Sequence, residues 1–259
     1  MISVDDMHGR PEKTFSLNGL VAALPLVCAM FVAIGCQPLQ VNNVRDRLIP
    51  SNNREWTADM TKLSTADFAG DEVTVHNIRN CEYVTENDYV VEYYDRTFRL
   101  DDIQSVDFIV VPFKNKAIAH TMLSFGLRDG IYICVSVEIR RELGEDYSTV
   151  LGMSNQYELI YLVAEERDLI RLRTRYRDAQ VYVYPTIATP DGAQKLFVDV
   201  FKRVNQLAVK PEFYNTFLNN CTTNIVSHVN DLKPNRVPFA WKVLLPGYEI
   251  GRASCRERV

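Results

Sequence analysis

One cysteine lies at a position where its thiol could act as a nucleophile. Cys221 follows Asn219 and Asn220, a residue type that often caps helix N-termini, and precedes a run that is typical of a helix. A thiol at a helix N-terminus has a lowered pKa because the helix dipole stabilises the thiolate. The sequence therefore predicts a reactive Cys221. The alternative is a buried cysteine that packs as a small apolar side chain.

A base for this thiol is predicted in a hairpin formed by residues 117–127 and 131–140. In both strands the odd-numbered positions are the more apolar, so both odd faces should lie against one core. Residues 128–130 (Arg-Asp-Gly) suit a three-residue loop with glycine in the left-handed position, which pairs Leu127 with Ile131. This register places His120 directly opposite Glu138, where a carboxylate can orient an imidazole.

The His120–Glu138 pair also has a simpler interpretation, as a half-exposed polar pair without chemistry. Two other histidines fit the role of base less well. His228 lies seven residues after Cys221, about 10.5 Å along a helix, which is too far for direct proton transfer. His76 lies in a predicted strand, and the sequence places no acidic partner beside it. We therefore expect His120 to deprotonate Cys221, with Glu138 as the orienting group.

The other cysteines bear on the state of Cys221. The chain contains six cysteines, and a disulfide between Cys81 and Cys134 would leave Cys221 as the free thiol. Zinc-ligand spacing is missing among the cysteines and histidines, and no phosphate-binding glycine loop or dinucleotide fingerprint occurs. The sequence therefore predicts no metal and no cofactor.

The two ends of the chain differ in character from the rest. Residues 17–35 carry almost no charge and end in Val-Ala-Ile-Gly before Cys36, a pattern typical of a lipoprotein signal whose cysteine becomes lipidated. An uncleaved membrane anchor and a buried helix are the alternatives for residues 1–35. Residues 250–259 look like a translated sequencing adapter, in which case the natural chain continues differently after Tyr248. We expect a domain at residues 71–249 that is truncated at its C-terminus, preceded by a polar segment at 36–70.

Composition limits the classes of partner. The chain of 259 residues has a formal net charge of −4 and 47% hydrophobic residues, which are values of a globular protein. Residues 36–249 alone carry 24 basic and 29 acidic side chains, a net charge of −5. An electrostatic nucleic-acid binder is therefore not expected. The arginine-rich run at 165–177 alternates in sign and is interpreted as a solvated helix face rather than a phosphate site.

The pattern of residues 71–249 predicts one α+β domain, an antiparallel sheet with helices packed on it. Residues 189–191 (Thr-Pro-Asp) are typical of a helix start, and that helix should run to about Val209 with Leu196, Val200 and Val204 on one face. A short helix is expected around residues 56–63, and a charged helix over 165–176. The expected strands cover residues 72–83, 88–100, 107–113, 117–127, 131–140, 157–164 and 180–185.

Several phrases together resemble one family, the Lnb N-terminal periplasmic domain. The resemblance covers roughly residues 56–248. The phrases that carry it are residues 77–80 (NIRN), 93–100 (YYDRTFRL), 119–126 (AHTMLSFG), 136–141 (SVEIRR), 144–148 (GEDYS), 166–168 (ERD), 171–173 (RLR), 211–216 (PEFYNT), 219–223 (NNCTT) and 245–247 (LPG).

This resemblance implies an envelope protein related to lipoprotein N-acyltransferases, in which a cysteine carries an acyl group as a thioester. By position, Cys221 would be the nucleophile, His120 the base and Glu138 the orienting group. The implied partners are a phospholipid acyl donor and a lipoprotein or peptide acceptor at the periplasmic side of the membrane. The order of histidine before cysteine is also similar to circularly permuted papain-like enzymes. A papain-like amidase or peptidase of the envelope and a non-catalytic envelope domain are therefore the alternatives.

Overall fold

The computed structural model describes residues 48–113, 118–145, 156–233 and 237 of the chain. Residues 1–35, Cys36, and residues 250–259 lie outside the described residues, and so do the predictions made for them. In the described part, the elements are a 3-10 helix at Ala58–Met60, β1 (Thr65–Ala69), β2 (Glu72–Tyr83), β3 (Tyr89–Arg99), a 3-10 turn at Leu100–Asp102, β4 (Ile103–Pro112), β5 (Ala119–Leu127), β6 (Tyr132–Arg140), β7 (Glu158–Glu165), α3 (Glu166–Arg171), a π-helix at Leu172–Tyr176, β8 (Tyr182–Pro185), α4 (Pro190–Val209) and α5 (Cys221–Leu232).

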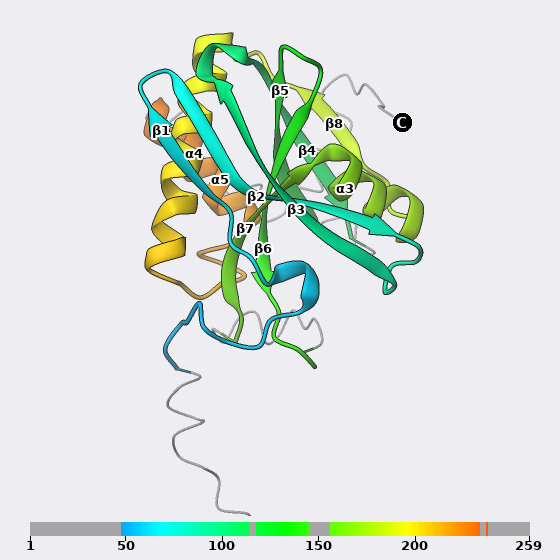
Figure 1. The fold of residues 1–259 in the computed structure, drawn as a ribbon. Coiled ribbons are helices and arrows are strands. Elements are labelled where there is room, and N and C mark those ends of the chain that lie inside the picture. Colours follow the sequence, from blue (N-terminus) through cyan, green and yellow to red (C-terminus); the bar gives the residue numbers. More distant parts are fainter. Residues whose placement is uncertain (1–47, 114–117, 146–155, 234–236, 238–259) are drawn as a thin grey trace, which may run out of the picture. The chain divides into compact units, whose positions relative to one another are not determined.

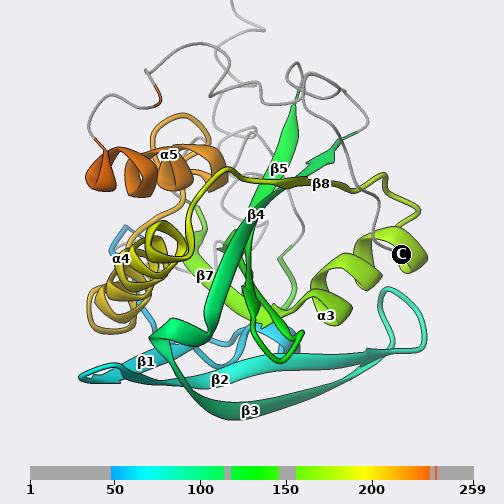
Figure 2. The ribbon, with the colours of Figure 1, turned by 90° about the horizontal axis from the view of Figure 1, so that it is seen from above.

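The strands form one mostly antiparallel sheet in the order β1-β2-β7-β6-β5-β4-β8, with β3 paired to the other side of β2. A single parallel pairing, between Arg79 of β2 and Ala164 of β7, joins the curved β1–β3 segment to the remaining strands. Figures 1 and 2 show α4 and α5 on one side of the sheet and α3 on the other. The predicted α+β class with an antiparallel sheet is confirmed.

The predicted register of the β5–β6 hairpin is confirmed. The backbone N–H of Leu127 donates to the carbonyl of Ile131 at 2.8 Å, and Gly130 has the left-handed φ of +85° that the three-residue loop requires. The ladder runs from Gly126–Tyr132 to Met122–Ser136. Met122–Ser136 is the last pair of the ladder at this end of the hairpin, and His120 and Glu138 lie just beyond it.

Both faces of the hairpin are buried, because helices cover both sides of the sheet. The odd-numbered face belongs to the main core, where Leu123 and Phe125 pack with Phe197 and Val200 of α4. The even-numbered face belongs to a second cluster beneath α3, which contains Met122, Cys134 and Leu162. Residues of the hairpin that face α3 are therefore enclosed, although the alternation of the sequence gave them a polar character.

Helix α4 forms as the sequence predicts. The side chain of Thr189 accepts a hydrogen bond from the backbone N–H of Gly192, and Pro190 occupies the first helical position. Leu196, Val200 and Val204 are all buried against the sheet. Among the described residues, no helix is long and apolar enough to cross a membrane.

Two predictions about elements need correction. No strand was expected before Glu72, yet Thr65–Ala69 forms β1 and pairs with β2 from Thr65–His76 to Ala69–Glu72. The expected charged helix at 165–176 is divided into α3 and a π-helix, and its face is not entirely solvated. Asp168 and Arg173 are buried with relative exposures of 0% and 5% because both form ion pairs inside the protein, whereas Arg171 and Arg175 are exposed.

Candidate active site

Cys221 is the first residue of α5, as the sequence predicts. Asn220 caps the helix, because its side-chain oxygen accepts a hydrogen bond from the backbone N–H of Thr223 at 2.9 Å. The Thr223 hydroxyl in turn accepts from the backbone N–H of Asn220 at 2.9 Å, which completes a capping box. This double cap fixes the start of α5 and therefore the position of the Cys221 backbone.

The surroundings of Cys221 favour the thiolate. Burial alone would raise the pKa of the thiol, since Cys221 is only 7% exposed. The charge of His120 and a hydrogen bond from its ring outweigh burial, and the backbone N–H of Thr121 adds a further hydrogen bond. The pKa of Cys221 is lowered from 9.0 to about 7.

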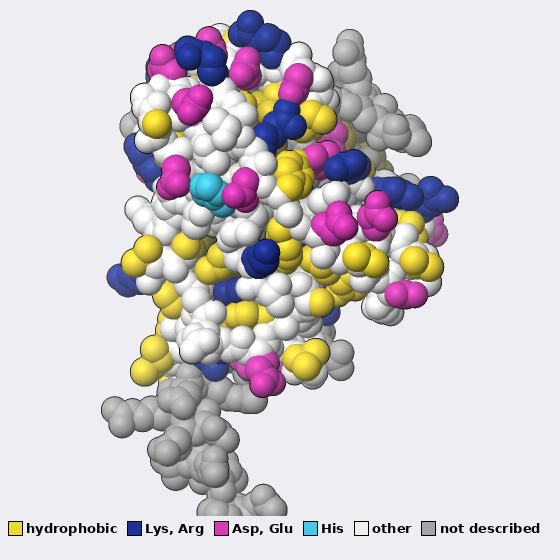
Figure 3. Space-filling model, viewed as in Figure 1, with side chains coloured by type: hydrophobic (Ala, Val, Ile, Leu, Met, Phe, Trp, Pro, Cys, Tyr) yellow, Lys and Arg dark blue, Asp and Glu magenta, His cyan; other side chains and the backbone are white. Residues whose placement is uncertain are grey.

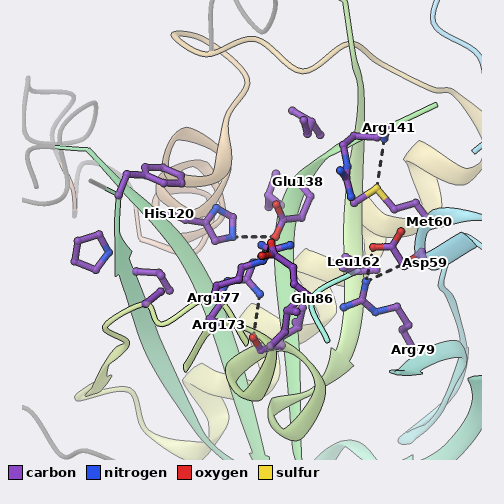
Figure 4. A pocket seen from close by; sticks show the side chains of 18 of the residues that line it. Asp59, Met60, Arg79, Glu86, His120, Glu138, Arg141, Leu162, Arg173 and Arg177 are labelled. Atoms are coloured by element: carbon purple, nitrogen blue, oxygen red, sulfur yellow. Dashed lines mark hydrogen bonds and ion pairs between the residues drawn. The ribbon is translucent and has the colours of Figure 1, made fainter. Parts of the chain in front are cut away.

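His120 is held from its other side by a hydroxyl and a carboxylate. Its Nε2 lies 2.7 Å from Ser136 Oγ and 3.1 Å from Glu138 Oε1, and the Ser136 hydroxyl donates to the same Glu138 oxygen at 2.6 Å. The imidazole of His120 points toward Glu138 in Figure 4. Because Nε2 is occupied, Nδ1 is the ring nitrogen that remains for Cys221.

The proximity of His120 and Glu138 agrees with the predicted register. Burial would lower the pKa of His120, but the charges of Glu138 and Cys221 outweigh burial and raise it from 6.5 to about 9. With a thiol pKa near 7 and an imidazole pKa near 9, about half of Cys221 is a thiolate at pH 7, and His120 is mainly the imidazolium. The site can therefore present a nucleophile without an external base.

Glu138 is itself held in the charged form by an arginine. Arg173 Nη2 donates to Glu138 Oε1 at 2.6 Å, and Arg173 Nη1 donates to the carbonyl of Leu169 at 3.0 Å. Burial opposes ionisation of Glu138, but the charges of His120 and Arg173 outweigh it and hold its pKa well below the ordinary value. The positive charge of Arg173 thus balances the negative charge of Glu138, which is the second anionic group of the site beside the Cys221 thiolate.

The sequence did not assign Ser136 and Arg173 to the site. Ser136 lies two residues before Glu138 on the same face of β6, so the alternation pattern could have identified it as a neighbour. Arg173 reaches Glu138 from a helix that packs across the sheet, and no local pattern encodes that contact. Arg173 lies in an arginine-rich run that the sequence analysis interpreted as a solvated helix face, so it was not singled out.

A pocket of about 630 Å³ adjoins His120 and Glu138 (Figure 4). It lies between the sheet and the α3 segment, and residues from the 3-10 helix and the β2–β3 turn also contribute to it. The sheet and the α3 segment both contribute apolar side chains to the walls of the pocket, and charged side chains lie among them. The apolar residues among those that line it include Val111, Phe113, Val137, Ile139, Leu162, Leu169 and Leu172.

The histidine of α5, His228, has a different set of partners from His120. His228 Nδ1 lies 2.7 Å from Asp199 Oδ2 of α4, and its Nε2 lies 2.9 Å from the hydroxyl of Tyr161 of β7. The Tyr161 hydroxyl also donates to the side-chain oxygen of Asn224 at 2.9 Å. This network joins α5 to α4 and β7, so it fixes the helix that carries Cys221.

The acidic partners of His76 were not found in the sequence. His76 Nδ1 lies 2.7 Å from Asp95 Oδ2 of β3, and His76 Nε2 lies 3.1 Å from Asp67 Oδ2 of β1. On the face shown in Figure 3, a histidine lies between acidic side chains. Asp95 and Asp67 raise the pKa of His76 by hydrogen bonding, so this cluster links three neighbouring strands.

The suggested Cys81–Cys134 disulfide is absent, because both residues are free buried thiols. Burial raises the pKa of Cys81 to about 12 and raises that of Cys134 as well. Of the three described cysteines, Cys221 is therefore the one with a lowered pKa. Within the described ranges, no group of three or more histidine, cysteine or carboxylate side chains could hold a metal ion.

A sequence model of the Lnb N-terminal periplasmic domain matches residues 89–247. The match comprises 159 of the 259 residues, more than half of the chain, and includes His120, Glu138 and Cys221. No curated protein and no solved structure matches the chain. The expected likeness to permuted papain-like enzymes therefore stays a prediction.

Proposed function

Because the chain belongs to the Lnb N-terminal periplasmic domain family, we propose that it is a periplasmic thiol acyltransferase with Cys221 as its nucleophile. One observation carries the proposal. His120 lowers the pKa of Cys221 at the start of α5, His120 contacts Glu138, and these last two residues line a pocket with apolar walls. Membership of a periplasmic domain family indicates the periplasmic side of the cell envelope.

In the first half of the proposed reaction, the Cys221 thiolate attacks the ester carbonyl of a phospholipid. The carbon–sulfur bond forms while the carbonyl electrons move to oxygen, and the backbone N–H groups of Cys221 and Thr222 in the first turn of α5 can stabilise that oxyanion. The ester carbon–oxygen bond then breaks. The imidazolium of His120 gives its proton to the departing lysophospholipid oxygen, which leaves an acyl thioester on Cys221 and a neutral imidazole.

In the second half, an amine attacks the thioester. Neutral His120 takes a proton from the amine nitrogen as the carbon–nitrogen bond forms, and the carbon–sulfur bond breaks to release an amide. The thiolate–imidazolium pair is restored at the end of the cycle. Glu138 keeps the same charge in both halves, since its part is to orient His120 and stabilise the imidazolium.

The walls of the pocket favour an acyl donor over a peptide. Val111, Phe113, Leu162, Leu169 and Leu172 offer apolar surface beside His120, which suits a hydrocarbon chain. The acceptor implied by the resemblance is the amino terminus of a lipoprotein. Attachment through a lipidated Cys36, or through an anchor at residues 17–35, would keep the domain beside the membrane that contains both substrates.

A second candidate is a cysteine amidase that acts on cell-wall peptide. The charged side chains that line the same pocket, among them Glu86, Arg177 and Asp178, favour this alternative because they could bind a polar peptide. The same nucleophile would then attack an amide, and water would replace the amine acceptor. The two functions differ in whether a long-chain thioester accumulates.

The test incubates the purified full chain with a phosphatidylglycerol in detergent micelles and measures the intact mass. We expect a mass gain of one acyl chain that neutral hydroxylamine removes, since hydroxylamine cleaves thioesters. Addition of a synthetic diacylated lipopeptide should discharge the adduct and give a hydroxylamine-stable amide on the peptide. Cys221→Ala should form no adduct, whereas Cys81→Ala, which removes a buried thiol elsewhere, should form it as the wild type does. Absence of a wild-type adduct, or an equal adduct on Cys221→Ala, would refute the acyltransferase.

A further inference from the structure

Four arginines line the pocket, and two of them form ion pairs with a buried and a partly buried carboxylate. Arg79 Nη2 lies 2.6 Å from Asp168 Oδ1, and Arg173 Nη2 lies 2.6 Å from Glu138 Oε1. The side chains of both arginines are at most 7% exposed, so their donors are directed into the protein. Neither guanidinium is available to a ligand without the loss of a buried ion pair.

The two remaining arginines differ from each other. Arg177 lies in the turn after the π-helix, and its Nε lies 2.8 Å from Glu86 Oε1 in the β2–β3 turn. Arg141 directly follows β6 and is partly buried. Among the described residues, no carboxylate forms an ion pair with the Arg141 guanidinium. Asp178 also lines the pocket and forms no ion pair with another described residue, but it is exposed, and solvent screens its charge.

Hydrogen bonds fix the backbone of Arg141, although its side chain has no ionic partner in the part of the chain that the structure describes. Its carbonyl accepts a hydrogen bond from the backbone N–H of Thr57 at 3.0 Å, and its own N–H donates to the sulfur of Met60 at 3.4 Å. The side chain lines the pocket, and in Figure 4 Glu138 lies between it and His120. A partly buried guanidinium that pairs with no carboxylate of the described residues suits an anionic ligand group.

The spacing between Arg141 and Glu138, which holds His120, is compatible with a phosphate near an ester. Arg141 lies three residues after Glu138, so their Cα atoms are about 10 Å apart along an extended strand. In a glycerophospholipid, a short glycerol unit separates the ester carbonyls from the phosphate. An ester carbonyl beside His120 would leave the phosphate on the Arg141 side of the pocket, with an acyl chain against the apolar walls.

We propose that Arg141 binds the phosphate of the acyl donor and so selects glycerophospholipids over neutral esters. This inference rests on the proposed acyltransferase function and names the residue that recognises its donor. Phosphate is bound well by a guanidinium because two N–H groups can donate to two of its oxygens in parallel. Arg141 contacts the part of the donor that does not react, so its role is recognition rather than proton transfer.

The experiment compares acylation of Cys221 by dihexanoylphosphatidylglycerol and by dihexanoylglycerol, which lacks the phosphate. For Arg141→Gln we expect the rate from the phospholipid to fall about 10- to 100-fold, the range of a lost charge-assisted hydrogen-bond pair. The rate from the neutral ester should stay unchanged. Arg175→Gln is the matched control, since Arg175 is exposed and does not line the pocket, and it should behave as the wild type with both donors.

Other outcomes separate this inference from the proposed function. Equal rates for Arg141→Gln and wild type with the phospholipid, or an equal fall with both donors, would overturn the role of Arg141. If wild type acylates with neither donor, the acyltransferase fails, and binding of the same two lipids to Cys221→Ala decides the inference alone. The inference is supported if Cys221→Ala binds the phospholipid more tightly than the neutral ester and Cys221→Ala/Arg141→Gln shows no such preference. Equal binding of both lipids by Cys221→Ala overturns the inference. A separate arm adds inorganic phosphate, which should compete only weakly, because tight binding of free phosphate would indicate a site for that ion instead.

Discussion

The ionic state of Cys221 depends on a carboxylate that does not touch it, and Glu138→Gln tests this dependence. Gln keeps the size of the side chain and an oxygen that can accept from Ser136 and Arg173, but it removes the negative charge. Without that charge the imidazolium of His120 loses the largest of the interactions that raise its pKa. The pKa of Cys221 must then rise, because the imidazolium is what lowers it.

The size of the effect follows from the shifted pKa values. The pKa of His120 is raised from 6.5 to about 9. This difference corresponds to roughly 3 kcal/mol in favour of the imidazolium, shared between Glu138 and Cys221. The pKa of Cys221 is about 7 in the wild type, so about half of the thiol is ionised at pH 7. If Glu138→Gln returns this pKa to between 8 and the ordinary 9.0, the thiolate fraction at pH 7 falls about 5- to 50-fold.

The assay is the rate of alkylation by iodoacetamide as a function of pH, with peptide mapping to assign the modified cysteine. Wild type should show a midpoint near pH 7 at Cys221, and Glu138→Gln a midpoint above pH 8. Glu92→Gln is the matched control, because Glu92 is exposed on β3 and its substitution removes the same charge from the surface. A wild-type midpoint near pH 9, or equal midpoints for wild type and Glu138→Gln, would refute the ion pair and the role of Glu138.

Three further predictions concern stability. Asp168→Asn should destabilise the fold by about 3 kcal/mol, because the buried guanidinium of Arg79 loses its closer charged partner and keeps only Asp59 at 3.3 Å, and urea unfolding measures this loss. Asn220→Ala should cost about 1 kcal/mol and also raise the midpoint of Cys221 alkylation, since the helix cap is lost; a stable variant with an unchanged midpoint would contradict the role of the cap. The pKa of His76 is raised in the folded state, so protonated His76 with its acidic partners stabilises the fold fully below pH 6.5. This stabilisation is lost as the pH rises through the higher folded-state pKa. Asp95→Asn should therefore lower the melting temperature at pH 5 more than at pH 8.5.

The sequence predicts the pairing of His120 with Glu138 because the information is local. Alternation defines which residues share a face, and the three-residue loop at 128–130 defines which residues lie opposite each other. The start of α5 at Cys221 is equally local, since Asn220 and Thr223 form the cap within four residues. These two local features are sufficient to nominate the site.

The remainder of the site depends on contacts between distant segments. Arg173 reaches Glu138 only because α3 and the π-helix pack over the even-numbered face of the sheet. His76 finds its acidic partners on two different strands, one of which, β1, has too weak an alternation to be recognised. Hydrophobic patterning could not indicate that both faces of the hairpin are covered, because small and polar residues such as Ser124 and Ser136 line the second face.

The two chemical partners of the site belong to different layers of the protein. Cys221 packs in the core shared with α4 and α5, whereas His120 lines the pocket on the α3 side of the same sheet. Substitutions in α3, or in Arg141 beyond the end of β6, can therefore reshape what the pocket accepts without disturbing the packing that holds the nucleophile. Under the proposed function, the residues that select the donor and the residue that reacts with it lie in different layers, so new substrate preferences could be engineered on one layer while the other stays constant.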